Sequence, residues 1–142
     1  MSTRSMIGKM APDGSVEAIY CHFDGYPEGV GRTLIDYYCG SSVDDLISLG
    51  DVSSLGRKPI SAPELWEREA KPFSVWDLGG EMTPAYKDRG ERGCEARIYP
   101  DDEAYVRAMP DRGAEWAYLF CDSEWLVSDG SGWKRLDDEL EG

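Results

Sequence analysis

The chain has 142 residues, of which 41% are hydrophobic and 11% aromatic, so it is long and apolar enough to bury one sizeable core. Its formal net charge of −13 at pH 7 would repel nucleic acid phosphates, which disfavours direct binding of DNA or RNA. No run approaches the roughly 18 apolar residues of a membrane span, and the N-terminus lacks the apolar stretch of a signal peptide. We therefore expect one globular domain in the cytosol.

The first fifty residues predict a β-hairpin followed by two helices. Strand candidates 5–10 and 16–23 flank Pro12-Asp13-Gly14, which supplies the fixed φ, the side-chain acceptor and the permissive residue of a tight turn. The spacing of apolar residues then indicates helices over 31–39 and 43–49, the second of which is ended by a glycine.

Residues 56–95 predict a loop-rich insertion, because frequent prolines and glycines break any long element there. Trp66 and Trp76 lie in this insertion, and two interpretations stay open: each indole packs in the core, or it is exposed and anchors a partner protein. The segment 86–91 alternates positive and negative charges and includes Arg89, a candidate for holding an anion.

The last third of the chain predicts one helix and a β-meander. Residues 96–100 favour a strand, and 101–109 favour a helix capped by Asp101. Three short aromatic-rich strands follow, over residues 116–121, 124–129 and 132–136, and the acidic end 137–142 should form a frayed tail. The whole pattern predicts a single α+β domain. Its antiparallel β-sheet, an N-terminal hairpin plus a C-terminal meander, would pack with two to three short helices.

Four cysteines are spread along the chain without a C-x-x-C pair, which argues against a zinc ribbon or finger. In a reducing cytosol they should be free thiols, and Cys21, Cys39 and Cys121 lie in apolar segments that favour burial. We expect no bound metal and no cofactor.

The segment IYCHFDGYPEGVG, residues 19–31, gathers the residue types of an active site. Alternation along a strand places Cys21 and His22 on opposite faces, so the two neighbours cannot form a nucleophilic pair. His22 and Asp24 fall on one side, where the carboxylate would orient the imidazole and fix the shape of a strand-to-helix corner.

Two chemical interpretations of this corner stay open. A small-ligand pocket, suited to a nucleotide signal, would be built from His22, Asp24, Tyr26, Glu28 and Arg89. The spacing matches no standard phosphate loop, however, and Glu28 would repel a phosphate. A hydrolase would instead need His22 next to a nucleophile such as Ser53, Ser54 or a cysteine from elsewhere in the fold.

The negative charge is concentrated in residues 95–142, which carry thirteen acidic and five basic side chains. A surface of that sign speeds encounter with basic protein surfaces. The candidate partner-binding residues are therefore four carboxylates and the two tryptophans of the insertion: Asp101, Asp102, Asp137, Asp138, Trp66 and Trp76. The expected partner is a host protein with a basic surface, and assembly with further copies of the chain stays open.

The runs MSTRSMIG, IYCHFDGYPEGVG, LISLGDVSSLG, YKDRGE, YLF and EWLVS extend in this order over most of the chain. In these runs the chain resembles a family of small, mostly uncharacterised proteins that are encoded in phages, prophages and other mobile elements of bacteria. The resemblance carries over no catalytic residues. It implies an accessory protein of the bacterial host cytosol, similar in kind to anti-restriction and anti-CRISPR inhibitors. The leading hypothesis is thus a non-enzymatic inhibitor of a host defence system, with a surface that mimics nucleic acid.

Overall fold

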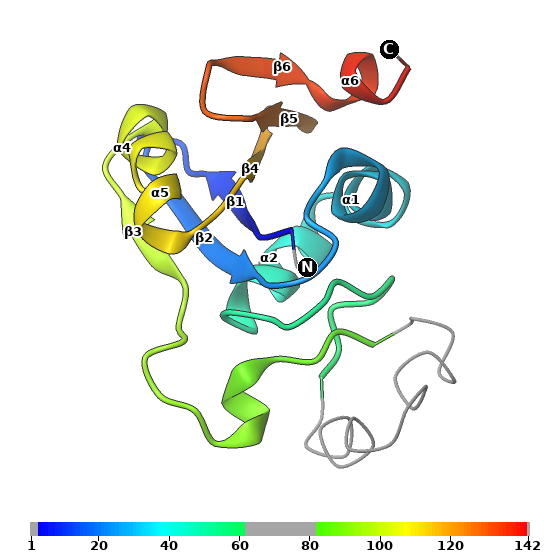
Figure 1. Cartoon of the computed structure of the whole chain (residues 1–142), viewed down its shortest axis with the longest axis vertical. Helices are drawn as coiled ribbons and strands as arrows, with labels where there is room; N and C mark the ends of the chain where they lie inside the picture. Colours follow the sequence, from blue (N-terminus) through cyan, green and yellow to red (C-terminus); the bar gives the residue numbers. More distant parts are fainter. Residues whose placement is uncertain (1–2, 62–81, 142) are drawn as a thin grey trace.

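A six-stranded mixed sheet forms the centre of the computed structural model, which describes residues 3–61 and 82–141. The strand order across the sheet is β3 (Arg97–Tyr99), β2 (Val16–Cys21), β1 (Ser5–Met10), β4 (Trp116–Cys121), β5 (Glu124–Ser128) and β6 (Trp133–Arg135). Short helices pack on both faces (Figure 1), which confirms the predicted single-domain α+β class.

The direction of β4 is the main departure from the predicted sheet. The hairpin β1–β2 and the meander β4–β5–β6 are antiparallel as predicted, but β1 and β4 pair in parallel, with Ser5 beside Trp116. The reason is the connection between β3 and β4, which runs through two helices. A helical crossover returns the chain to the sheet in the same direction, so β4 runs parallel to β3 and to β1.

Helices cover the two faces of the sheet unequally. One face carries η1 (Pro27–Gly31), α1 (Arg32–Tyr37), α2 (Ser41–Ser48) and α6 (Leu136–Glu141), and the other carries α4 (Asp102–Arg107) and α5 (Met109–Arg112) (Figure 1). Each face has its own hydrophobic cluster, so apolar side chains alternate along the central strands. On β2, Ile19 and Cys21 belong to the first cluster, and Val16 and Ala18 belong to the second.

The helix boundaries follow local chemistry. The Asp101 side chain accepts a hydrogen bond from the Ala104 backbone N–H (2.8 Å), which confirms the predicted cap. The predicted helix 101–109 divides into α4 and α5 around Ala108, because Pro110 lacks the N–H that a continuous helix needs. The predicted helix 43–49 corresponds to α2.

Two expectations about exposure are wrong. The acidic end forms helix α6 rather than a frayed tail, because the fully buried Leu136 and the partly buried Leu140 fix it to the first cluster. Cys39 is exposed, since the buried side chain that ends α1 is that of its neighbour Tyr38. No helix within residues 3–61 and 82–141 has the length and apolar character that crossing a membrane requires.

Candidate functional site

The corner that follows β2 is shaped by backbone hydrogen bonds. Asp24 has a positive φ of 57°, a conformation that Asp and Asn tolerate better than most residues, and it turns the chain away from the sheet. The Gly25 N–H donates to the Thr3 carbonyl (2.8 Å), and the Tyr118 hydroxyl donates to the Gly25 carbonyl (2.6 Å). The Val30 N–H donates to the Asp24 carbonyl (2.8 Å), which joins the corner to η1. The loop is therefore fixed from both sides.

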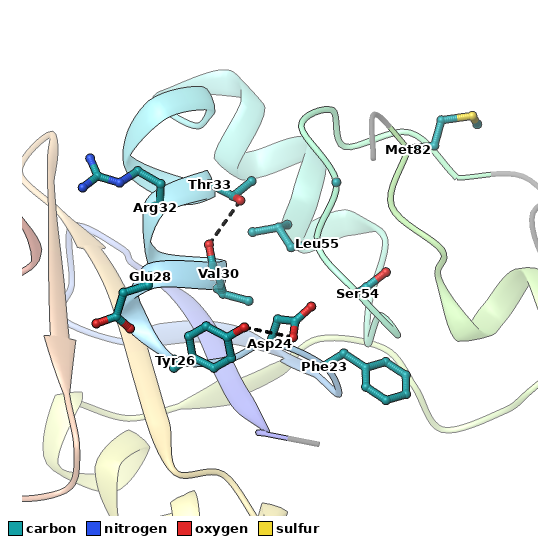
Figure 2. A pocket seen from close by; sticks show the side chains of 12 residues that line it. Phe23, Asp24, Tyr26, Glu28, Val30, Arg32, Thr33, Ser54, Leu55 and Met82 are labelled. Atoms are coloured by element: carbon teal, nitrogen blue, oxygen red, sulfur yellow. Dashed lines mark hydrogen bonds between the residues drawn. The ribbon is translucent and has the colours of Figure 1, made fainter. Parts of the chain in front are cut away.

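This corner forms one wall of a pocket of about 230 Å³, shown in Figure 2. Val30 and Leu55 provide apolar surface inside it, and Asp24 lies between them and Ser54. Phe23 and Tyr26 border it and stay 41% and 40% exposed. Large aromatic side chains that remain this exposed beside a concave site are typical of a binding surface.

The polar groups of the pocket give it a negative character. The Tyr26 hydroxyl donates to the Asp24 carboxylate at 3.3 Å, and the negative charge of Asp24 raises the pKa of Tyr26. Glu28 and Arg32 also line the pocket, but in Figure 2 the Arg32 side chain points away from Leu55 and Asp24. A bound phosphate would therefore meet an uncompensated carboxylate.

The opposite wall is held by a buried hydroxyl. The Thr83 hydroxyl accepts a hydrogen bond from the Gly56 N–H (3.0 Å) and donates to the Lys58 carbonyl (2.8 Å). The Tyr38 hydroxyl donates to the Gly56 carbonyl (2.8 Å), which connects this wall to the end of α1. Burial raises the pKa of Tyr38 to about 12, so this donor stays protonated at neutral pH.

His22 lies beside this pocket and not in its lining. Its Nδ1 and the Tyr20 hydroxyl are joined by a hydrogen bond of 2.8 Å, and its ring meets the Phe23 ring edge-on at 4.5 Å. Burial, assisted by the positive charge of Arg4, lowers the pKa of His22, so the ring is neutral at pH 7. The predicted pairing of His22 with Asp24 is wrong, because the positive φ of Asp24 ends the strand alternation on which that pairing depended.

Among the described residues, the His22 ring forms a hydrogen bond with Tyr20 and with none of the candidate nucleophiles. Ser53 is buried and its carbonyl accepts from the Phe23 N–H (2.9 Å), while Ser54 lines the pocket. The Cys21 thiol points into the first hydrophobic cluster, on the opposite face from Tyr20 and His22, as alternation predicted. Burial raises the pKa of Cys21 to about 12, which removes its thiolate at neutral pH.

Thiol labelling should separate the exposed Cys39 from the buried Cys21. At pH 8 a maleimide is expected to modify Cys39 within minutes and to leave Cys21 intact until urea unfolds the chain, because only the thiolate reacts and Cys21 is inaccessible. Mass spectrometry of proteolytic fragments gives the site and the time course. A Cys39→Ser variant is the control. Rapid native-state labelling of Cys21 would contradict its placement.

A buried ion pair near the corner joins two residues that no sequence motif marks. Asp51 and Arg112 form a salt bridge of 3.0 Å, with side chains only 12% and 13% exposed. Asp51 also accepts from the Tyr20 backbone N–H (2.9 Å), and the Arg112 guanidinium lies 5.3 Å from the centre of the Tyr20 ring. Burial raises the pKa of Asp51, and the Tyr20 N–H and Arg112 offset part of this rise. The pair connects α5 to the segment that forms the wall behind the corner.

The four acidic partner-binding candidates do not form one surface. Asp101 and Asp102 begin α4, whereas Asp137 and Asp138 lie in α6, and these helices cover opposite faces of the sheet. The guanidinium of Arg135 lies between α6 and β5, 3.7 Å from the Asp137 carboxylate and 3.4 Å from that of Glu124. The two pairs would therefore contact different partners or different parts of one partner.

A group of carboxylates from α4 and the β4–β5 hairpin lies near Cys121. The Cys121 thiol lies 3.8 Å from the Asp122 carboxylate, and Cys121 pairs with Glu124 across the β4–β5 hairpin. Burial raises the pKa of Cys121, and the negative charges of Asp122, Asp102 and Glu124 raise it further. We call Asp102, Asp122 and Glu124 the acidic patch. Asp102 was expected as a partner contact. Asp122, in the hairpin turn, and Glu124, at the start of β5, were missed because no sequence motif marks them.

The remaining candidates lie outside the described part of the structure: Trp66, Trp76 and the side chain of Arg89. Among the residues that are described, no group of three or more His, Cys, Asp or Glu side chains could hold a metal ion. No protein-family model, no curated protein and no solved structure matches this chain.

Proposed function

We propose that this chain is a non-enzymatic accessory protein of a mobile element that binds a basic surface on a host protein. A nucleic-acid-targeting defence effector, of the kind that anti-CRISPR and anti-restriction proteins inhibit, is the proposed target. The acidic patch carries this proposal. It presents Asp122 and Glu124 exposed and Asp102 half-buried at one end of the sheet, in a chain with a net charge of −13. Glu124 also pairs with the exposed Arg135 at 3.4 Å, so Asp122 and Asp102 provide most of the patch's negative charge.

Electrostatics explains how such a surface would inhibit. A nucleic-acid channel is lined with Lys and Arg that bind phosphates, so a folded surface bearing fixed carboxylates competes for the same cations. Carboxylates on short, anchored elements lose little conformational freedom on binding. Asp102 lies in the first turn of α4 and Asp122 in a two-residue hairpin turn, and both elements are held by the strands beside them.

Inhibition of purified effectors should depend on the acidic patch. We expect the protein to block DNA cleavage by at least one enzyme in a panel of RNA-guided nucleases and restriction endonucleases. The double variant Asp102→Asn/Asp122→Asn should weaken this inhibition by about tenfold or more, since charge complementarity governs association. Both replacements keep the backbone preference, because Asn also tolerates the positive φ of 51° at Asp122.

The matched control is Asp36→Asn/Asp45→Asn, which removes the same charge from exposed positions of α1 and α2, on the other face of the sheet from α4. Inhibition by this control should stay within about twofold of that by the unmodified protein. The affinity of the unmodified protein should fall steeply between about 50 and 300 mM salt, because a Debye length of about 10 Å or less screens charges on exposed surfaces. An equal loss in both double variants, or tight binding that ignores salt, would contradict the acidic patch as a nucleic-acid mimic. Failure to inhibit any effector of the panel would contradict the anti-defence assignment.

A further inference from the structure

We infer that the pocket beside the corner receives an arginine side chain of the partner protein, with its guanidinium against Asp24 and between the exposed rings of Phe23 and Tyr26. This inference rests on the proposed function, since it supplies the position at which a basic partner is recognised by shape as well as by charge. The acidic patch attracts a partner, and the pocket would select one residue of it.

The carboxylate of Asp24 is available for such a contact. Within residues 3–61 and 82–141 it has no ion pair, and its hydrogen bond with the Tyr26 hydroxyl is long at 3.3 Å. Figure 2 shows Asp24 facing the interior of the pocket, between Tyr26 and Ser54. A guanidinium would give it the charge-assisted, bidentate partner that it lacks.

The two aromatic residues favour a planar cation. Phe23 and Tyr26 expose about two fifths of their surface on either side of Asp24, and ring faces attract cations within about 6 Å. Arginine stacks on rings and binds carboxylates through a rigid fork, whereas lysine is a strongly hydrated point charge. The chain already uses this contact internally, because the Arg112 guanidinium lies 5.3 Å from the Tyr20 ring centre.

Size and lining agree with one side chain rather than a whole metabolite. A volume of about 230 Å³ is below the roughly 300–1,000 Å³ that is typical of small-molecule sites. Val30 and Leu55 offer apolar surface for the methylene stem of an arginine, which gains from burial while its charged end stays at the rim.

The test is a titration of the isotope-labelled full chain with N-acetyl-arginine amide, followed by NMR chemical shifts. We expect saturable shifts at Phe23, Tyr26 and Leu55, and at least tenfold weaker binding of N-acetyl-citrulline amide, which has the same shape without the charge. Asp24→Asn should weaken arginine binding by about tenfold. The control Asp45→Asn removes an equal charge from the exposed face of α2 and should leave the binding unchanged.

Two further variants, at the aromatic rings, test the inference independently if Asp24→Asn perturbs the structure of the corner. Phe23→Leu should weaken arginine binding by about threefold through loss of the cation–π contact, whereas Tyr26→Phe keeps the ring, frees Asp24 and should bind at least as tightly. Equal binding of the citrulline amide, or equal affinity of Asp24→Asn and Asp45→Asn, would overturn the inference. Equal binding of N-acetyl-lysine amide would overturn its choice of arginine.

This titration needs no effector, so its outcome is separate from that of the proposed function. Arginine binding without inhibition of any effector would leave the pocket established and remove the anti-defence assignment. Inhibition that depends on the acidic patch, without arginine binding, would remove the pocket alone.

Discussion

Replacing Arg112 by methionine is expected to lower the free energy of unfolding by about 3–5 kcal/mol at pH 7.5, which is the effect of removing one partner from a buried ion pair. The variant leaves the Asp51 carboxylate buried, and among the described residues the Tyr20 N–H is its remaining hydrogen-bond donor. Methionine keeps most of the apolar volume of the arginine stem, so the loss reports the charge rather than a cavity. Urea unfolding followed by tryptophan fluorescence measures it.

The pH dependence gives this prediction a second measurement. The folded-state pKa of Asp51 is raised by burial, and loss of Arg112 raises it further. A carboxyl whose pKa is raised on folding contributes stability at low pH that is lost as the pH rises through the folded-state pKa. The deficit of Arg112→Met relative to the unmodified protein should therefore be largest at pH 7.5 and should shrink toward pH 4.5.

Arg107→Met is the matched control for Arg112→Met. Arg107 lies in the neighbouring helix α4 and pairs with Glu103 at 3.1 Å, but the two side chains are 77% and 75% exposed. Its replacement changes the net charge equally and should cost roughly 0.5 kcal/mol or less. Equal losses in the two variants, or a pH-independent deficit in Arg112→Met, would show that Asp51 and Arg112 are not a buried pair.

Replacing Gly50 by alanine should lower the free energy of unfolding by about 3 kcal/mol, from two causes that add. Gly50 has a φ of 78°, where an alanine side chain is strained. A Cβ at this position would also overlap the carbonyl oxygen of Cys94. That oxygen is held in place by a hydrogen bond from the Asp51 N–H (2.7 Å), so it cannot move away without disturbing the segment that carries the ion pair.

Gly14→Ala separates the two causes. Gly14 has a φ of 89° in the β1–β2 turn, and a Cβ there would meet no atom within 4 Å. It should cost about 1 kcal/mol, which is the backbone strain alone. Thermal or urea unfolding of both variants measures the difference. Similar losses would contradict the close approach of residues 50 and 94.

The elements that the sequence predicted correctly are those with local signals. The turn at Pro12-Asp13-Gly14, the cap at Asp101 and the helix ended by Gly50 each depend on residues within a few positions of one another. The separation of Cys21 from His22 was equally local, since it follows from the two-residue period of a strand.

The errors arose where distant residues decide. The parallel pairing of β1 with β4 depends on how a helical crossover returns to the sheet, and no local pattern encodes it. The pairing of His22 with Tyr20 rather than Asp24 depends on one backbone torsion at Asp24. The acidic end was expected to fray because its charges are visible in the sequence, whereas the site that buries Leu136 is not.

By itself the sequence determined the α+β class, the hairpin and meander, the negative charge and the corner at residues 22–31, because composition and short-range spacing specify these. The tertiary structure alone decided that Asp24, Phe23 and Tyr26 border a pocket completed by Leu55, and that Asp51 meets Arg112 across sixty-one positions of sequence. The physical reason is that the rest of the chain decides how buried a carboxylate is and which groups lie beside it. An exposed carboxylate such as Asp24 is available to a ligand, whereas a buried one such as Asp51 is costly to keep charged without a partner.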